Sequence, residues 1–288
     1  MNQEHALLWL RAELCAAAVG SLAAELAPEG ITLLAFKGLH LALGVAKEPW
    51  QSRPFADADT IVVAGSFRRA VRKLASTGRF RVRRDDWSCC MVVDERDVPI
   101  DLHRRALPAF FGAVSNEALL RRASPAPAPL TGVLFPDLVD AAALAIAHFV
   151  KDKNGRFGHG LLATDLALLS SAGVTPKALA SRLAEHKLRR VGLVALRSLA
   201  EADPRWGDWY EVLHPSNYEH RYAAAVGAVF RGAGPKHRQR ALAFLAAHTI
   251  GDDLSDAAAN FVLGTAVRLP YIAMEVMDDE TRWVGSAR

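Results

Sequence analysis

Cysteine is scarce in this chain of 288 residues, which contains only Cys15, Cys89 and Cys90. An odd number of cysteines with two of them adjacent cannot form the disulfide framework of a small secreted protein. No C-x-x-C pair occurs, and Cys89 and Cys90 do not have zinc-site spacing relative to His103. Adjacent residues of a strand also point to opposite faces. We therefore expect reduced thiols in a cytoplasmic protein, and no zinc site.

Long apolar runs and a strong excess of one charge are also missing. No apolar stretch reaches about 18 residues without a charge or a helix breaker, so no membrane span is expected. Glu4, Arg11 and Glu13 interrupt the apolar N-terminus, which predicts an amphipathic helix and not a signal peptide. The 35 Lys and Arg residues nearly balance the 31 Asp and Glu residues, and a net charge of +4 is too weak to imply nucleic acid.

Two common enzyme motifs are absent as well. The chain has neither a G-x-x-x-x-G-K-[S/T] phosphate loop nor a G-x-S-x-G nucleophile elbow. The densest basic region, residues 68–84, lacks the interleaved aromatic residues of a nucleic-acid surface, so it predicts a solvated helix face and an exposed strand. Nucleic-acid binding by this region remains an alternative that a salt-dependent gel shift would test.

The first half of the sequence alternates helical and strand patterns. Helical spacing covers residues 4–26 and 67–76, and short apolar runs at 31–36 and 58–63 predict buried strands. A hairpin is expected around the turn Asp94–Asp97. The proline-alanine stretch 124–129 marks the best boundary, which gives domains 1–123 and 130–288. Beyond it, Ala-rich and Leu-rich segments predict a helical domain with helices at 137–150, 161–171, 176–201, 218–231, 237–248 and 253–267.

Three carboxylates are the strongest candidates for chemistry. Asp57 and Asp59 flank Ala58 at the start of a strand, so a period of two puts both on one face, with Cα atoms about 6.6 Å apart. Asp101 lies on the polar face of a neighbouring predicted strand, opposite Ile100 and Leu102. Oxygen donors of this kind suit Mg²⁺. The competing interpretation is a set of solvated surface acids.

A phosphate site is suggested just upstream. Lys37 and Gly38 follow a predicted strand and open a helix, where glycine permits close approach and the lysine adds positive charge. Arg53 stands four residues before Asp57 and is suited to bidentate contact with a phosphate. An exposed loop lysine and a surface ion pair are the alternative explanations for Lys37 and Arg53.

Other polar residues are weaker candidates for substrate contact. His103 follows Asp101 by two positions and would orient that carboxylate or touch substrate, although a satisfied polar residue at a strand end is the commoner case. A second group lies in the helical half, where it would line a cleft between the domains and select the acceptor: Lys151, Arg156, His159 and Asp165. A solvated basic loop is the competing explanation for the first three of these.

Taken in order, these motifs resemble those of a known family. Phe36-Lys37-Gly38, then Arg53-Pro54-Phe55-Ala56-Asp57-Ala58-Asp59, then Ile100-Asp101-Leu102-His103 are similar to the K-G, R-P-x-x-D-x-D and D-L-H motifs of an uncharacterised bacterial nucleotidyltransferase family. That family belongs to the DNA polymerase beta-like superfamily. The resemblance covers roughly residues 31 to 170.

The resemblance implies an α+β fold with a minimal nucleotidyltransferase mixed sheet and flanking helices, followed by an α-helical domain. It implies transfer of a nucleoside monophosphate from a nucleoside triphosphate, with ATP the expected one, to an acceptor it does not identify. Asp57, Asp59 and Asp101 would hold Mg²⁺ or Mn²⁺, and Lys37, Gly38 and Arg53 would face the triphosphate. The alternative is an inactive nucleotidyltransferase-like binding or regulatory protein.

Overall fold

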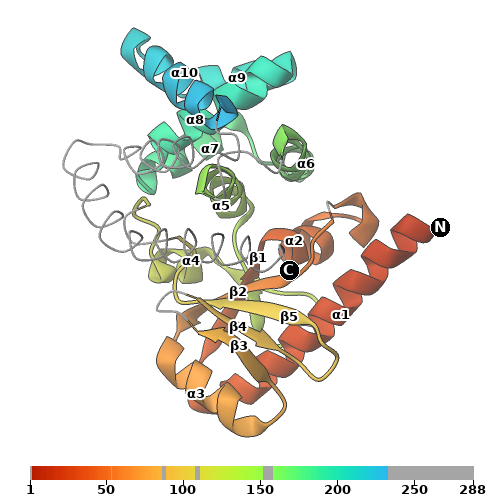
Figure 1. Ribbon diagram of the computed structural model, residues 1–288. Coiled ribbons are helices and arrows are strands. Elements are labelled where there is room, and N and C mark those ends of the chain that lie inside the picture. Colours follow the sequence, from red (N-terminus) through yellow and green to blue (C-terminus); the bar gives the residue numbers. More distant parts are fainter. Residues whose placement is uncertain (1, 53, 86–88, 108–110, 152–157, 233–288) are drawn as a thin grey trace, which may run out of the picture.

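The strands of this protein form one mixed sheet, which the computed structural model places between two layers of helices (Figure 1). The structure describes residues 2–52, 54–85, 89–107, 111–151 and 158–232. The strands are β1 (Thr32–Phe36), β2 (Ala58–Ala64), β3 (Arg81–Asp85), β4 (Cys89–Val93), β5 (Pro99–His103), β6 (Ser124–Pro125) and β7 (Val133–Phe135), in the spatial order β3-β4-β5-β2-β1-β7-β6. The pairs β2/β5 and β1/β7 are parallel, and the other neighbours are antiparallel.

Helices precede, interrupt and follow the sheet. They are α1 (Gln3–Leu26), α2 (Lys37–His40), α3 (Phe67–Thr77), α4 (Asn116–Arg122), α5 (Leu138–Lys151), α6 (Gly158–Ser171), α7 (Pro176–Glu185), α8 (Arg189–Ala202), α9 (Gly207–Glu211) and α10 (Asn217–Gly232). Capping explains why several begin where they do. The Ser66 hydroxyl, for example, accepts a hydrogen bond from the Arg69 amide at the start of α3. The predicted α+β fold with a following helical region is confirmed.

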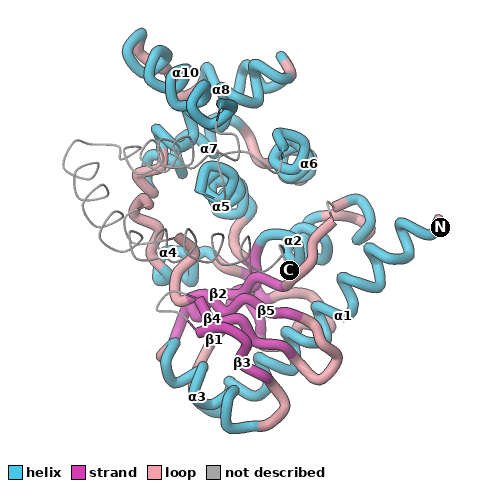
Figure 2. The backbone as a smooth tube through the Cα atoms, in the orientation of Figure 1, coloured by secondary structure: helices cyan, strands magenta, loops and turns pink. Residues whose placement is uncertain are grey.

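Alternation along the central strands gives the sheet two buried faces. In β1, Leu33 and Ala35 pack with α1 and α3, whereas Leu34 and Phe36 pack with the later helices. Figure 2 shows the sheet between α1 and α3 on one side and the helices from α5 onward on the other. Burial on both faces explains why β1 reads as a continuous apolar run.

The sheet continues past residue 123, where the sequence suggested a domain boundary. β7 pairs in parallel with β1, and Ser124 and Pro125 pair with β7 at the edge of the sheet. An edge position tolerates proline because the missing N–H faces away from the ladder. The domain limits 1–123 and 130–288 stay a prediction. The predicted helices at 237–248 and 253–267 lie outside the described residues.

The predicted helix 176–201 is wrong, because the chain breaks it into α7 and α8. At the break, Lys187 adopts a left-handed conformation with φ of 51°. His186 beside it is buried, and its Nε2 lies 2.8 Å from Asp140 Oδ1. A tertiary contact thus ends a helix that composition alone favours.

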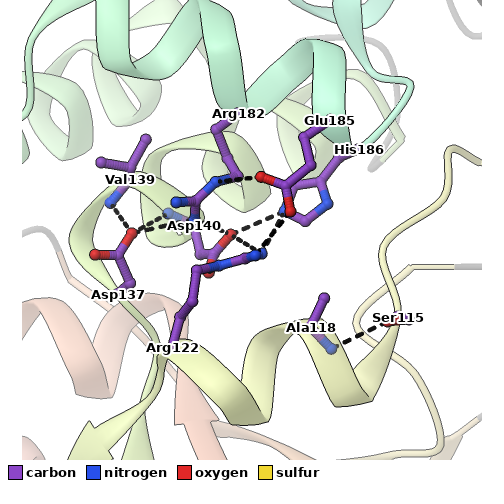
Figure 3. Close-up of polar contacts among 9 residues, drawn as sticks. All are labelled: Ser115, Ala118, Arg122, Asp137, Val139, Asp140, Arg182, Glu185 and His186. Carbon is purple, nitrogen blue, oxygen red and sulfur yellow. Dashed lines mark hydrogen bonds and ion pairs between the residues drawn. The ribbon is translucent and has the colours of Figure 1, made fainter.

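Asp140 of α5 is the centre of a buried ionic cluster (Figure 3). Arg122 of α4 donates to both carboxylate oxygens, from Nε at 2.8 Å and from Nη2 at 3.0 Å. Arg182 of α7 forms a further ion pair with Asp140, and Glu185 bridges the two arginines. These bonds hold the pKa of the Asp140 carboxyl at about 2 despite its burial. The cluster ties the helix before the sheet's last strands to the helical layer.

One described helical stretch, Gln3–Glu29, is long and apolar enough to cross a membrane by length and composition. Leu22 and Leu26 near its C-terminal end are fully buried against the sheet, together with Cys15 and Val19. A core helix of a globular protein and a signal sequence near the N-terminus both pass the same test.

Candidate functional site

Strand register brings two of the candidate carboxylates side by side. Asp59 of β2 is the direct partner of Asp101 in the parallel strand β5, and both side chains lie on the face that the later helices cover. Asp57 lies just before β2 and is half-buried. All three carboxylates are close enough for their charges to act on one another.

Asp59 is the most enclosed of the three and has two polar partners. Lys37 Nζ donates to Asp59 Oδ1 at 2.8 Å, and His103 Nε2 lies 3.1 Å from the same oxygen. Burial would raise the pKa of Asp59, but the positive charge of Lys37 and the bond with His103 lower it below its usual range. Asp59 is therefore ionised whenever the protein is folded near neutral pH.

The pKa values of Asp57 and Asp101 shift in the opposite direction to that of Asp59. Burial and the negative charge of Asp59 raise the pKa of both carboxyl groups. In addition, Asp101 Oδ1 is buried without a hydrogen-bond partner among the residues that the structure describes. A buried carboxylate oxygen left in this state is costly unless something binds it. Three oxygen donors with one buried oxygen unsatisfied fit a hard cation such as Mg²⁺.

Lys37 and Gly38 occupy the turn from β1 into α2. Lys37 adopts a left-handed conformation with φ of 55°, and its amine returns to Asp59 across the strand end. A Cβ at Gly38 would lie 2.5 Å from Phe55 Cβ, so this glycine gives close packing against the loop that leads to Asp57. The proposed contacts of Lys37 and Gly38 with a triphosphate stay predictions, and Arg53 lies outside the described residues.

An amide side chain fixes the ends of the two site strands. Asn116 Nδ2 at the start of α4 donates to the carbonyl of Val62 at 2.7 Å and to the carbonyl of Arg104 at 2.9 Å. These carbonyls belong to β2 and to the residue after β5. The contact holds the two strands in the register that pairs Asp59 with Asp101. The sequence interpretation did not identify Asn116.

Aromatic packing connects the site to the helical layer. The His103 and Phe36 rings meet edge-on with their centroids 5.7 Å apart. The ring of the buried His148 of α5 is tilted against the same phenyl ring, with a centroid distance of 5.5 Å. His148 was not among the predicted site residues. Its apolar helix gives no local signal, because only the sheet–helix contact brings it to Phe36.

The other predicted acceptor residues are placed less completely. Lys151 is half-buried at the end of α5, and Asp165 is buried in α6. His159 belongs to the first turn of α6, but its side chain is not described, and Arg156 lies outside the described residues. A joint role for these four stays a prediction.

Cys89 is a site neighbour that spacing along the sequence did not reveal. The β4–β5 hairpin pairs Cys89 directly with His103, and ligand atoms of Cys89, Asp101 and His103 all lie within 4.8 Å of one another. Cys89 and His103 lack zinc-site spacing along the sequence, and antiparallel register is what brings them together. The expected absence of a zinc site stays a prediction. Cys90 faces the opposite core, as expected for adjacent strand residues.

The basic region matches the predicted solvated face. Arg68, Arg69 and Arg72 are exposed on α3, and Arg81 is exposed on the edge strand β3. Arg69 pairs with Glu29, and Arg81 pairs with Asp97. Neighbouring acids thus neutralise part of the charge.

A sequence model of a family described as uncharacterised nucleotidyltransferase matches residues 1–202. The chain belongs to this family. The match includes α1, the whole sheet and the helices through α8, and it agrees with the resemblance seen in the sequence motifs. No curated protein matches the chain. Membership supports nucleotidyl transfer in general terms.

Proposed function

We propose that the protein transfers a nucleoside monophosphate from a nucleoside triphosphate, ATP first among them, to an acceptor molecule. The pairing of Asp59 with Asp101, which leaves Asp101 Oδ1 buried and unsatisfied, carries the proposal. In the reaction, a bond forms between an acceptor oxygen or nitrogen and the α-phosphorus. The bond from that phosphorus to the bridging oxygen breaks, pyrophosphate leaves with the electron pair, and the acceptor proton passes to solvent.

Asp57, Asp59 and Asp101 would hold Mg²⁺, or Mn²⁺ in its place. The cation would neutralise phosphate charge and position the reacting groups. Lys37 donates to Asp59, and we propose that its positive charge also attracts a phosphate oxygen. His103 keeps Asp59 ionised and oriented. Gly38 and Arg53 are proposed to complete the triphosphate contacts.

We propose that the helical layer selects the acceptor. The metal and triphosphate candidates all precede residue 104, whereas Lys151, Arg156, His159 and Asp165 belong to the helical half. His148 contacts Phe36, so α5 reaches the edge of the site. A small molecule, a peptide or a protein would be an acceptor of suitable size. Because the chain has an odd number of cysteines with two of them adjacent, we keep the cytoplasm as the proposed location.

One observation favours the alternative of an inactive nucleotide-binding protein. The Lys37 amine already neutralises Asp59, which is one of the proposed cation ligands. An inactive protein would bind a triphosphate without releasing pyrophosphate. An active one would release pyrophosphate only with a divalent cation and an acceptor.

The decisive experiment combines pyrophosphate release with mass spectrometry. The full chain is incubated with Mg²⁺, each of the four ribonucleoside triphosphates and a cell extract, and products and the protein itself are searched for an added nucleoside monophosphate. Activity in the wild type and its loss in Asp101→Asn would support the proposal. Tight nucleotide binding with no pyrophosphate under any condition would favour the inactive alternative.

A further inference from the structure

Three chemically different ligands meet on one face of the β4–β5 hairpin. Cys89 of β4 pairs with His103 of β5, and Asp101 stands two residues before His103 on the same face. The thiol, carboxylate and imidazole ligand atoms lie within 4.8 Å of one another. Cys89 is buried, and Asp101 and His103 are half-buried. The proposed nucleotidyl transfer uses Asp101 and His103 but has no use for the thiol.

This donor set suits a different cation from the carboxylate group. Zn²⁺ takes thiolate, imidazole and carboxylate ligands in tetrahedral geometry, where neighbouring ligand atoms lie roughly 3.5 Å apart. Small side-chain movements therefore suffice to close the group around one ion. Mg²⁺ prefers oxygen ligands and gains little from a thiolate. Three protein ligands would leave the fourth zinc position open to water.

One further observation supports a cation at this place. Asp101 Oδ1 is buried and unsatisfied among the described residues, and a buried oxygen in this state is costly unless something binds it. Arg84 Nη2 donates a hydrogen bond to Cys89 Sγ at 3.8 Å, and a bound cation would take the place of that donor at the sulfur.

We propose that Cys89, Asp101 and His103 bind a thiophilic divalent cation, Zn²⁺ above all, and that this binding stops nucleotidyl transfer. Zinc bound here would engage Asp101, one of the three carboxylates proposed to hold Mg²⁺. It would also draw His103 away from Asp59. The inhibitory half of the proposal rests on the proposed function, whereas the binding half stands on the cluster alone.

Cobalt binding to the full chain tests the binding half without any activity. Co²⁺ added to the metal-free protein should give the intense near-ultraviolet absorption of a cobalt–thiolate bond at one ion per chain, and Zn²⁺ should abolish it. The Cys89→Ala variant should lose this absorption. Cys90→Ala is the matched control, because Cys90 is adjacent but faces the opposite core. Cys15→Ala serves if Cys90→Ala does not fold.

The absence of a thiolate band in the wild type, or an unchanged band in Cys89→Ala, would overturn the cation site. Since the chain has only three cysteines, the two controls account for every other thiol.

The inhibitory half is tested in the Mg²⁺-dependent transfer assay. Zn²⁺ should inhibit the wild type, a chelator should restore activity, and Cys89→Ala should need roughly tenfold more zinc or higher for the same inhibition. Equal zinc sensitivity in Cys89→Ala and wild type would refute zinc control through this group. A cobalt–thiolate band in a protein that transfers no nucleotide would instead refute the proposed function and leave the cation site standing.

Discussion

The three site carboxylates differ in a way that their spacing in the sequence does not indicate. The D-x-D pair and Asp101 predict three similar acids that repel one another. In the structure, Lys37 and His103 lower the pKa of Asp59, whereas burial and the charge of Asp59 raise the pKa of Asp57 and Asp101. The effect of removing one carboxylate on the stability of the fold therefore depends on which of the three is removed.

Asp101→Asn and Asp59→Asn are expected to separate activity from stability. Both should reduce transfer by roughly a hundredfold or more, because each removes a proposed cation ligand. Asp101→Asn should leave the melting temperature unchanged or raised, since repulsion falls. Asp59→Asn should lower it, because Lys37 and His103 lose their common partner. Thermal unfolding of the two purified variants decides this, and a raised melting temperature in Asp59→Asn would contradict the structure.

Gly38→Ala is expected to destabilise the turn before the site. The new Cβ would meet Phe55 Cβ at 2.5 Å, an overlap that requires movement of the loop leading to Asp57. Overpacking of this kind costs about 1 to 3 kcal/mol. Gly160→Ala is the matched control, because nothing lies within 4 Å of its added Cβ and alanine favours the helix. Urea unfolding should show a lower free energy of unfolding for Gly38→Ala and not for Gly160→Ala. If Gly38→Ala is as stable as the wild type, Phe55 moves aside without a measurable cost.

At the scale of elements, the local sequence pattern predicts helices and strands well where buried residues recur regularly. It fails where a contact with a residue distant in the sequence determines where a helix ends. α1, α3, β1, β2 and the hairpin follow from periodicity, capping residues and turn residues. The break between α7 and α8 does not, because Lys187 and its neighbours contain no glycine or proline. Long-range contacts of His186 accompany the break: its ring bonds Asp140, 46 positions earlier, and its carbonyl accepts from the Ala113 amide at 2.7 Å.

The Asp140 cluster gives stability a defined dependence on pH. The pKa of the Asp140 carboxyl in the folded protein is about 2, below the ordinary 3.8. The ionised carboxylate therefore stabilises the fold. This stabilisation is fully present above about pH 5 and is lost as the pH falls through 2. The contribution is on the order of 2 kcal/mol. Asp140→Asn should cost about 2 kcal/mol near neutral pH, because Arg122 and Arg182 lose their common buried partner and keep the more exposed Glu185 and Asp137.

Unfolding of wild type and Asp140→Asn at several pH values measures this effect. The difference in unfolding free energy should shrink as the pH falls from about 5 to about 2. Glu201→Gln, which breaks the more exposed pair with Arg197, should cost less than about 1 kcal/mol. If the difference in unfolding free energy between wild type and Asp140→Asn stays constant across the acid range, the negative charge of Asp140 does not contribute to stability.

At the scale of the whole molecule, the site was predictable as a list of residues but not as an assembly. The motifs indicate Asp57, Asp59 and Asp101, yet their meeting depends on a parallel pairing of strands about 40 positions apart. The contact of Lys37 with Asp59 follows from the antiparallel pairing of β1 with β2, and the position of Cys89 follows from that of β4 with β5. No local pattern in a sequence specifies long-range register, since several strand orders bury the same faces.

The two halves of the chain are expected to depend on each other for folding. A fragment of residues 1–123 would lose β7, the parallel neighbour of β1, and would expose Leu34, Phe36 and Ile61 of the sheet. We expect it to aggregate or to unfold without a cooperative transition, whereas the full chain melts cooperatively. Circular dichroism and size-exclusion chromatography measure both properties. A soluble fragment with a sharp transition would establish 1–123 as an independent domain.

Asn116 bears on how members of the family can diverge. Among the residues that the structure describes, its amide nitrogen bonds only main-chain carbonyls, those of Val62 and Arg104, so the contact does not depend on the side chains at positions 62 and 104. Drift at these two positions leaves the bonds intact, while nearly any change at 116 removes one or both donors. Among aligned relatives, position 116 should therefore vary much less than the exposed position 104, and this contact between the two site strands would not give rise to a covarying pair.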